Sequence, residues 1–167
     1  MKTLFSFILI TLALNTYSQK VSPYDNIQLH TASDFRKAEP HVILASELVL
    51  SLPIEKENIN RNNAISFIMK WMSGTSDYSF MMDETLVKVT GNDRDLIGVY
   101  CACISKYAIE KGKGYDRDSL KLNAYILLAR YCENPNNKYK VRGEIKKLID
   151  AKNENKVKEY LDSKQKK

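Results

Sequence analysis

Side chains capable of chemistry lie close together around the only tryptophan of the chain. Trp71, Asp77 and Tyr78 fall within one run of eight residues. If the loop after Trp71 folds back over the end of its helix, an indole, a carboxylate and a phenol would line one small pocket. A large aromatic residue inside a helix is also typical of a core, and Asp77 could instead close an Asx-turn. The three residues therefore form a candidate binding pocket with a structural alternative.

Motifs of known catalytic or metal chemistry are missing from the sequence. It contains two histidines, and it has no HExxH, no G-x-S-x-G and no phosphate-binding glycine loop. Two carboxylate pairs fall where helices are expected to begin: Asp93 with Asp95, and Asp116 with Asp118. At such positions carboxylates accept hydrogen bonds from free backbone N–H groups and favour the helix dipole. We therefore expect no catalytic residues, no metal site and no cofactor.

Three cysteines could act in redox chemistry, in metal binding or as core residues. Cys101 and Cys103 are two positions apart on one expected helix, so their side chains diverge by about 200° and cannot bridge. Cys132 lies on the next helix, with an axial offset from Cys101 of about 7.5 Å and an interhelical distance of about 8–10 Å. A disulfide needs Cα atoms within about 7 Å. We therefore expect three buried thiols; a C-x-C metal or redox motif would lack further ligands nearby.

The first 18 residues have the features of a secretory signal peptide. Lys2 supplies the positive charge, Leu4–Leu14 form the apolar segment, and the small residues Thr16 and Ser18 precede the expected cleavage site. The apolar segment is shorter than the roughly 20 residues that span a bilayer. An ordinary N-terminal helix is the alternative. We expect a periplasmic or secreted protein without a transmembrane helix in its mature chain.

Positive charge is concentrated at the C-terminal end of the sequence. Lys138–Lys167 contains 11 lysines and arginines against 5 acidic residues, whereas residues 19–137 contain 14 against 15. Such an end could approach an anionic envelope surface or an acidic protein partner, and the alternative is a solvated helix face with a lysine tail. The candidate contacts are Lys146, Lys147, Lys156 and Lys158. Nucleic acid is excluded as a partner, because the sequence has no binding motif for it and is expected to be exported.

The elements that would hold these residues are helices. The helix around Trp71 is expected to begin with Asn60 as its N-cap, to carry a wide apolar face and to end at a left-handed Gly74. Helical patterns also cover residues 34–52, 94–111, 117–133, 138–151 and 154–163. Pro40 either starts a new helix within the first of these ranges or kinks it. Residues 81–90 fit a short strand or a helical turn, and both stay open.

Short links between these helices predict an all-α fold. They imply a single compact domain of about five or six antiparallel or orthogonal helices. The 149 residues after the expected cleavage site are enough for one domain with a core. We expect a signal peptide at residues 1–18, an extended arm at 19–33, a helical domain at 34–163 and a basic tail at 164–167.

A pattern of aromatic and small residues surrounds Trp71: Arg61, Ala64, Phe67, Ile68, Trp71, Met72, Gly74, Thr75, Asp77, Tyr78 and Phe80. It resembles the pattern in small exported proteins of Bacteroidota-type bacteria, and the likeness extends through Tyr131 and Pro135. Those proteins are uncharacterised. The resemblance therefore implies a shared all-helical fold, and it supplies no activity, ligand or catalytic residue.

Two functions remain after these exclusions. We favour an exported, non-catalytic helical protein that binds a protein partner or an anionic envelope surface through its basic end. The alternative is a small hydrolase or a ligand-binding module with its site near Trp71, Asp77 and Tyr78. An exposed Trp71 in a concave site with Asp77 beside it would favour the second function. A buried Trp71 would favour the first, together with a continuous lysine face across Lys146, Lys147, Lys156 and Lys158.

Overall fold

Helices account for the regular structure of the described residues. The computed structural model describes residues 22–55 and 57–165, so the predicted signal peptide lies outside them. Within these ranges the chain forms seven α-helices and two short 3₁₀ turns, at Gly112–Gly114 and Pro135–Asn137, and no strand. The α-helices are α1 (Ala32–Ser51), α2 (Ile59–Gly74), α3 (Glu84–Thr90), α4 (Arg94–Lys111), α5 (Arg117–Glu133), α6 (Gly143–Asn153) and α7 (Val157–Gln165). The predicted all-α single domain is confirmed.

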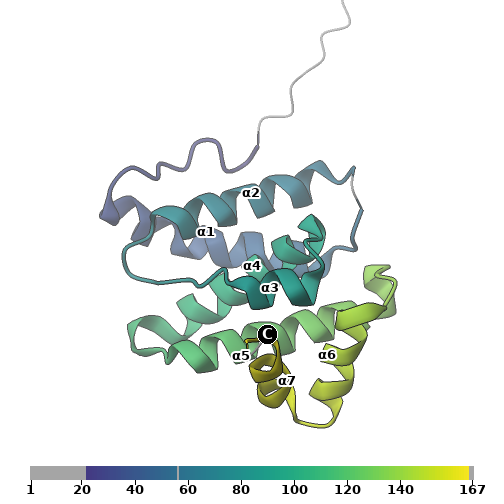
Figure 1. Cartoon of the computed structure of the whole chain (residues 1–167). Helices are drawn as coiled ribbons and strands as arrows, with labels where there is room; N and C mark the ends of the chain where they lie inside the picture. Colours follow the sequence, from purple (N-terminus) through teal and green to yellow (C-terminus); the bar gives the residue numbers. More distant parts are fainter. Residues whose placement is uncertain (1–21, 56, 166–167) are drawn as a thin grey trace, which may run out of the picture.

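The central helix of the domain is α4. On one side α1 and α2 pack against each other and against α4, and on the other side α5 packs along α4 (Figure 1). α6 and α7 cover α5, and α3 reaches from α4 to both of them. Trp71, Tyr100 and Tyr125 are among the largest fully buried side chains. The rings of Tyr100 and Tyr125, with centroids 4.9 Å apart, join α4 to α5 in a tilted aromatic pair.

Side-chain caps explain where the middle helices begin. Asp93 caps α4 and Asp116 caps α5, as predicted, because their carboxylates accept hydrogen bonds from backbone N–H groups of the first turn. The predicted cap of α2 is wrong. Asn58 is the N-cap instead of Asn60, since its side-chain oxygen accepts a hydrogen bond from the backbone N–H of Arg61 at 3.1 Å.

α1 is one continuous helix, so Pro40 does not start a new one. The helix begins at Ala32, two residues earlier than predicted, because Thr31 and Asp34 form a capping box. It ends at Ser51, and Leu52 is extended, as expected for a residue that precedes a proline.

Gly74 is required by close packing and not by a left-handed backbone, which corrects the prediction. It is the last residue of α2, and its φ is not among the positive values of the described glycines. A Cβ at this position would lie 2.2 Å from Cζ of Phe35 on α1. The absence of a side chain therefore lets the end of α2 approach the start of α1.

From residue 81 onward the structure decides one open point and corrects the bounds of two predicted helices. Residues 81–90, left open between strand and helix, contain α3, which begins at the N-cap Asp83 and ends at the left-handed Gly91. The two last helices, predicted at 138–151 and 154–163, lie at 143–153 and 157–165. Lys138 and Asn155 have φ values of 55° and 57°, and such left-handed residues interrupt a helix.

Both ends of the described chain are packed. In the predicted arm, the ring of Tyr24 stacks on Phe67 of α2 with centroids 4.6 Å apart, and Leu29 is buried. At the other end Lys164, which was expected in a basic tail, belongs to α7. Its Nζ lies 2.5 Å from Oε2 of Glu144 on α6.

Candidate functional site

Trp71 is a core residue. Its side chain has no exposed surface, and its Nε1 donates a hydrogen bond to the backbone oxygen of Phe35 at 2.9 Å. The rings of Tyr78 and Phe80 pack on it at centroid distances of 5.5 Å and 5.8 Å. Because the only polar atom of the indole is paired and the ring is enclosed, Trp71 is not available to a ligand in this conformation.

Asp77 and Tyr78 fasten the loop after α2 to the elements around it. Asp77 accepts a hydrogen bond from Nε of Arg36 at 2.6 Å, and its other oxygen lies 3.2 Å from Nζ of Lys113. The hydrogen bond from Arg36 is the main reason that the pKa of Asp77 lies below its ordinary value. Burial is the main cause that raises the pKa of Tyr78 to about 12. Tyr78 thus packs on Trp71, whereas Asp77 is held by Arg36 and Lys113, and the three candidate residues line no open pocket.

The four candidate lysines are exposed and paired with carboxylates. Their side chains are 62–73% exposed. Each Nζ lies within 3.0 Å of a carboxylate oxygen nearby in the sequence: Lys146 with Asp150, Lys147 with Glu144, Lys156 with Glu154 and Lys158 with Asp162. Exposed pairs of this kind contribute little free energy, so the lysines stay accessible while their charge is partly balanced.

All three cysteines are buried free thiols, as predicted. Burial raises the pKa of Cys101 to about 12 and that of Cys132 to about 12, and it also raises the pKa of Cys103. Since the thiolate is the reactive form of cysteine, these residues behave as small hydrophobic side chains.

A methionine-lined surface was missed by the sequence reasoning. Met69, Met72, Met81 and Met82 are all the methionines after Met1, and Met69, Met81 and Met82 are 44%, 48% and 47% exposed. A hollow of about 220 Å³ is lined by Met69, Met72, Ser73, Phe80, Met82 and Cys101. A larger hollow of about 870 Å³ is lined by Asn62, Ile65, Ser66, Met69, Asp93, Arg94, Asp95 and Ile97. Met69 belongs to both hollows, and together they are called the methionine groove below.

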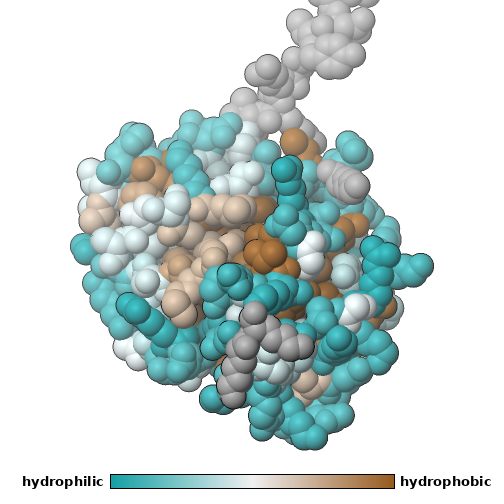
Figure 2. All heavy atoms as spheres, viewed as in Figure 1, coloured by the Kyte–Doolittle hydropathy of each residue, from teal (hydrophilic) through white to brown (hydrophobic). Residues whose placement is uncertain are grey.

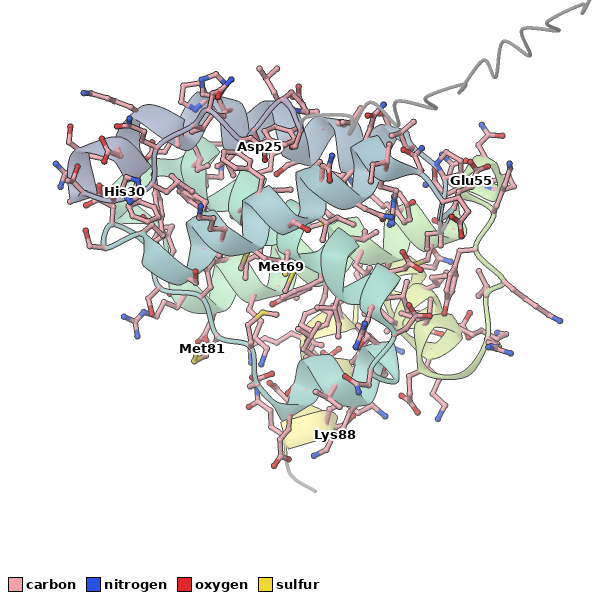
Figure 3. The ribbon with its side chains drawn as sticks, turned by 90° about the horizontal axis from the view of Figure 1, so that it is seen from above. Asp25, His30, Glu55, Met69, Met81 and Lys88 are labelled. Carbon is pink, nitrogen blue, oxygen red and sulfur yellow. The ribbon has the colours of Figure 1, made fainter. Side chains whose placement is uncertain are left out.

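Three elements build the methionine groove. One wall is a face of α2, the opposite wall includes Phe80 and Met82 of the segment before α3, and α4 contributes Ile97 and Cys101 between them. Met69 points from α2 toward the space between α2 and α3 (Figure 3). Apolar side chains gather in the middle of the face that α2 and α3 share (Figure 2). The sequence signal for this surface was the concentration of four methionines between residues 69 and 82.

Comparison with known proteins adds no functional assignment. No family model, no curated protein and no solved structure matches the chain. In the described ranges no helix has the length and apolar character to cross a membrane, and no three histidine, cysteine or acidic side chains are grouped to hold a metal ion. The function is therefore argued from the sites themselves.

Proposed function

We propose that the protein is an exported, non-catalytic binding protein that holds an amphipathic helix of a partner protein in the methionine groove. The observation that carries this proposal is the groove itself, a surface hollow with methionines and other apolar side chains along its length and a polar end at Asp93, Arg94 and Asp95; Met69 belongs to both of its parts. Export rests on the signal-like residues 1–18 of the sequence. The enclosed Trp71 favours a binding role over the hydrolase alternative, because its ring offers no open site.

Methionine suits a binding surface of this kind. Its unbranched thioether side chain adapts to the shape of an apolar partner, and methionine-rich surfaces bind varied helices for that reason. Contiguous exposed apolar patches on single domains often mark binding sites. Three of the four methionines after Met1 keep close to half of their surface exposed, so a partner could bury it.

The shape of the methionine groove favours a helix as its occupant. The wall formed by α2 runs from Asn62 to Ser73, which corresponds to about 16 Å along the helix axis. That length matches about three turns of a docked helix. Such a helix would place apolar side chains at positions i, i+3 or i+4, and i+7 into the groove.

Charge at the groove is close to balanced. One end carries Asp93, Arg94 and Asp95, and Asp95 is paired with the buried Arg61 through a contact of 2.8 Å. The other end is lined by uncharged residues. We therefore expect binding through apolar contact that changes little with salt concentration, in contrast to binding by a basic surface.

Methyl NMR of a chain labelled at the methionine methyl groups tests this proposal. The probe is a 14-residue helical peptide without net charge, with leucines at i, i+3, i+4 and i+7, and its control is the same composition in scrambled order. We expect the amphipathic peptide to shift the signals of Met69, Met72 and Met82, equally at low and high salt. Met69→Glu should abolish the shifts.

Leu44→Glu is the matched control, because Leu44 is a single exposed apolar residue, 61% exposed, on α1. It should leave peptide binding unchanged. The proposal would be overturned if the amphipathic peptide did not shift the methionine signals. It would also be overturned if the signals of Met72 and Met82 shifted equally in Met69→Glu and in the parent chain. Signals that shift with protein concentration alone would assign the groove to a second copy of the chain instead.

A further inference from the structure

We propose that a second groove, where α5, α6 and α7 meet, binds a single-chain anionic amphiphile such as a fatty acid. This cationic groove is a hollow of about 320 Å³ lined by Leu122, Ile126, Arg130, Lys152, Asn155, Val157 and Lys158. It shares no lining residue with the methionine groove. The two proposals are therefore independent and can be tested separately.

The lining changes from apolar to cationic along one face of α5. Leu122, Ile126 and Arg130 are four positions apart, so they project from the same side of that helix. The distance from the first to the last is about 12 Å along the axis. Val157 from α7 adds a further apolar side chain. An amphiphile has the same gradient, with a hydrocarbon chain at one end and an anionic headgroup at the other.

Three cations and no carboxylate line the cationic groove. Arg130 is exposed, and the carboxylate of Glu133, three positions later on α5, interacts with it electrostatically. Lys152 pairs with Glu133 on α5, and Lys158 pairs with Asp162 at 3.0 Å. An ammonium group has three N–H donors, so both lysines keep donors for a headgroup.

The start of α7 adds to the positive potential of the groove. Val157 and Lys158, the first two residues of this nine-residue helix, both line the groove. The first turn of a helix carries the positive end of the helix dipole and backbone N–H groups without intrahelical partners. Arg130 and Lys152 lie in the last turns of α5 and α6, where the helix dipoles are negative, so the net positive charge of the hollow comes mainly from its three side-chain cations.

A single-chain ligand fits the cationic groove better than a bilayer surface. The groove is concave, and its volume lies at the lower end of the range of about 300–1,000 Å³ that is typical of small-molecule sites. Glu133 and Asp162 stand beside the lysines that they pair with. A flat anionic membrane would meet these carboxylates together with the lysines, whereas one headgroup can reach the cations alone.

Calorimetric titration of the full-length mature chain with laurate, below its critical micelle concentration, tests the proposal. We expect saturable binding of laurate and of dodecyl phosphate, and no binding of dodecyltrimethylammonium, which has the same chain with a positive headgroup. Inorganic phosphate alone should bind more weakly than dodecyl phosphate. Arg130→Glu should weaken laurate binding by about tenfold or more.

Lys146→Glu is the matched control, because Lys146 is exposed on α6 and does not line the groove. It should change the affinity for laurate by less than about twofold. In NMR spectra of this variant, laurate should shift the methyl signal of Ile126 as it does in the parent chain. Equal binding of laurate by Arg130→Glu, or equal binding of the cationic amphiphile, would overturn the proposal. A third outcome is that the chain binds phosphatidylglycerol vesicles but not laurate, and that Arg130→Glu and Lys146→Glu weaken vesicle binding equally. This outcome would also overturn the proposal, and it would mean that the basic side chains bind a membrane surface.

Discussion

Arg61 provides the sharpest test of how the core tolerates charge. Its side chain has no exposed surface, and its Nη1 donates to Oδ1 of Asp95 at 2.8 Å. Nε and Nη2 are buried and make no hydrogen bond with the described residues. The hydroxyl of nearby Tyr131 donates its proton to the backbone oxygen of Leu52 at 2.7 Å, so that only its lone pairs are left to interact with the guanidinium. One carboxylate therefore balances a buried cation with two unpaired donors.

The two partners of this pair should respond differently to substitution. Asp95→Asn leaves the guanidinium buried without its counter-charge, and breaking a buried pair in this way costs about 3–5 kcal/mol. Asp95 is 25% exposed, so water replaces part of the interaction and we expect a loss of about 2–3 kcal/mol. This corresponds to about 6–10 °C in Tm for a domain of this size.

Arg61→Met should be much less damaging than Asp95→Asn. It keeps most of the buried alkyl volume while it removes the charge and both unpaired donors, and exchanges of this kind are often neutral or stabilising. We expect a change within about 1 kcal/mol. The double variant should resemble Arg61→Met, since Asp95 then has no buried charge to balance.

Urea unfolding followed by Trp71 emission and by circular dichroism measures these differences. The buried indole reports on the core next to α2, and the helix signal reports on the whole domain. Equal destabilisation by the two single variants, or additive losses in the double variant, would refute the reasoning. Equal losses would mean that the ion pair itself is net stabilising, and additive losses would mean that the two side chains do not interact.

Three further predictions concern packing, pH and thiol chemistry. Gly74→Ala should lower the unfolding free energy by about 1–2 kcal/mol, because the new Cβ meets the ring of Phe35; Gly114→Ala, at an open position, is the control and should not. Hydrogen bonding, first from Lys147, lowers the pKa of Glu144 from 4.5 to about 2. The stability that Glu144 adds is therefore present above pH 4.5 and is lost as the pH falls toward 2, so the difference in urea midpoint between the parent chain and Glu144→Gln should shrink over that range. In the folded chain at pH 8 the three buried thiols should not react with a thiol reagent, and in denaturant all three should react.

Each of these predictions has a clear contrary result. Equal stability of the two alanine variants would mean that Phe35 moves aside freely. A Glu144→Gln difference that stays constant between pH 7 and pH 3 would contradict the lowered pKa. Rapid labelling of any cysteine in the native chain would show that the core opens locally around it.

The sequence predicted best the features that depend on neighbouring residues. α4 and α5 lie at the expected ranges, because Asp93 and Asp116 are strong local caps followed by long apolar stripes. The all-α class followed from the same local patterns. Asn60 was mistaken for the cap of α2 because Asn58, two residues earlier, offers the same chemistry.

Features that depend on contacts between distant residues could not be predicted from the sequence. The role of Gly74 is set by Phe35, almost forty residues earlier, and no local pattern reports that contact. The burial of Trp71 depends on a hydrogen bond to the same residue. The methionine groove depends on α3 being a helix that leaves Met69 uncovered, and the pattern of residues 81–90 left that point open.

The position of α3 also determines the order in which the domain can be completed during synthesis. Nζ of Lys88 on α3 donates to the backbone oxygen of Lys164 at 3.1 Å, across 76 residues of chain. α1, α2 and α4 can pack before the C-terminal residues exist, whereas α3 gains its contacts with α6 and α7 only after those helices have been made. Closing so long a loop is slow compared with forming the helices. The α2 and α4 walls of the methionine groove can therefore form before α3 is fixed, and a partner could reach them before the domain is complete.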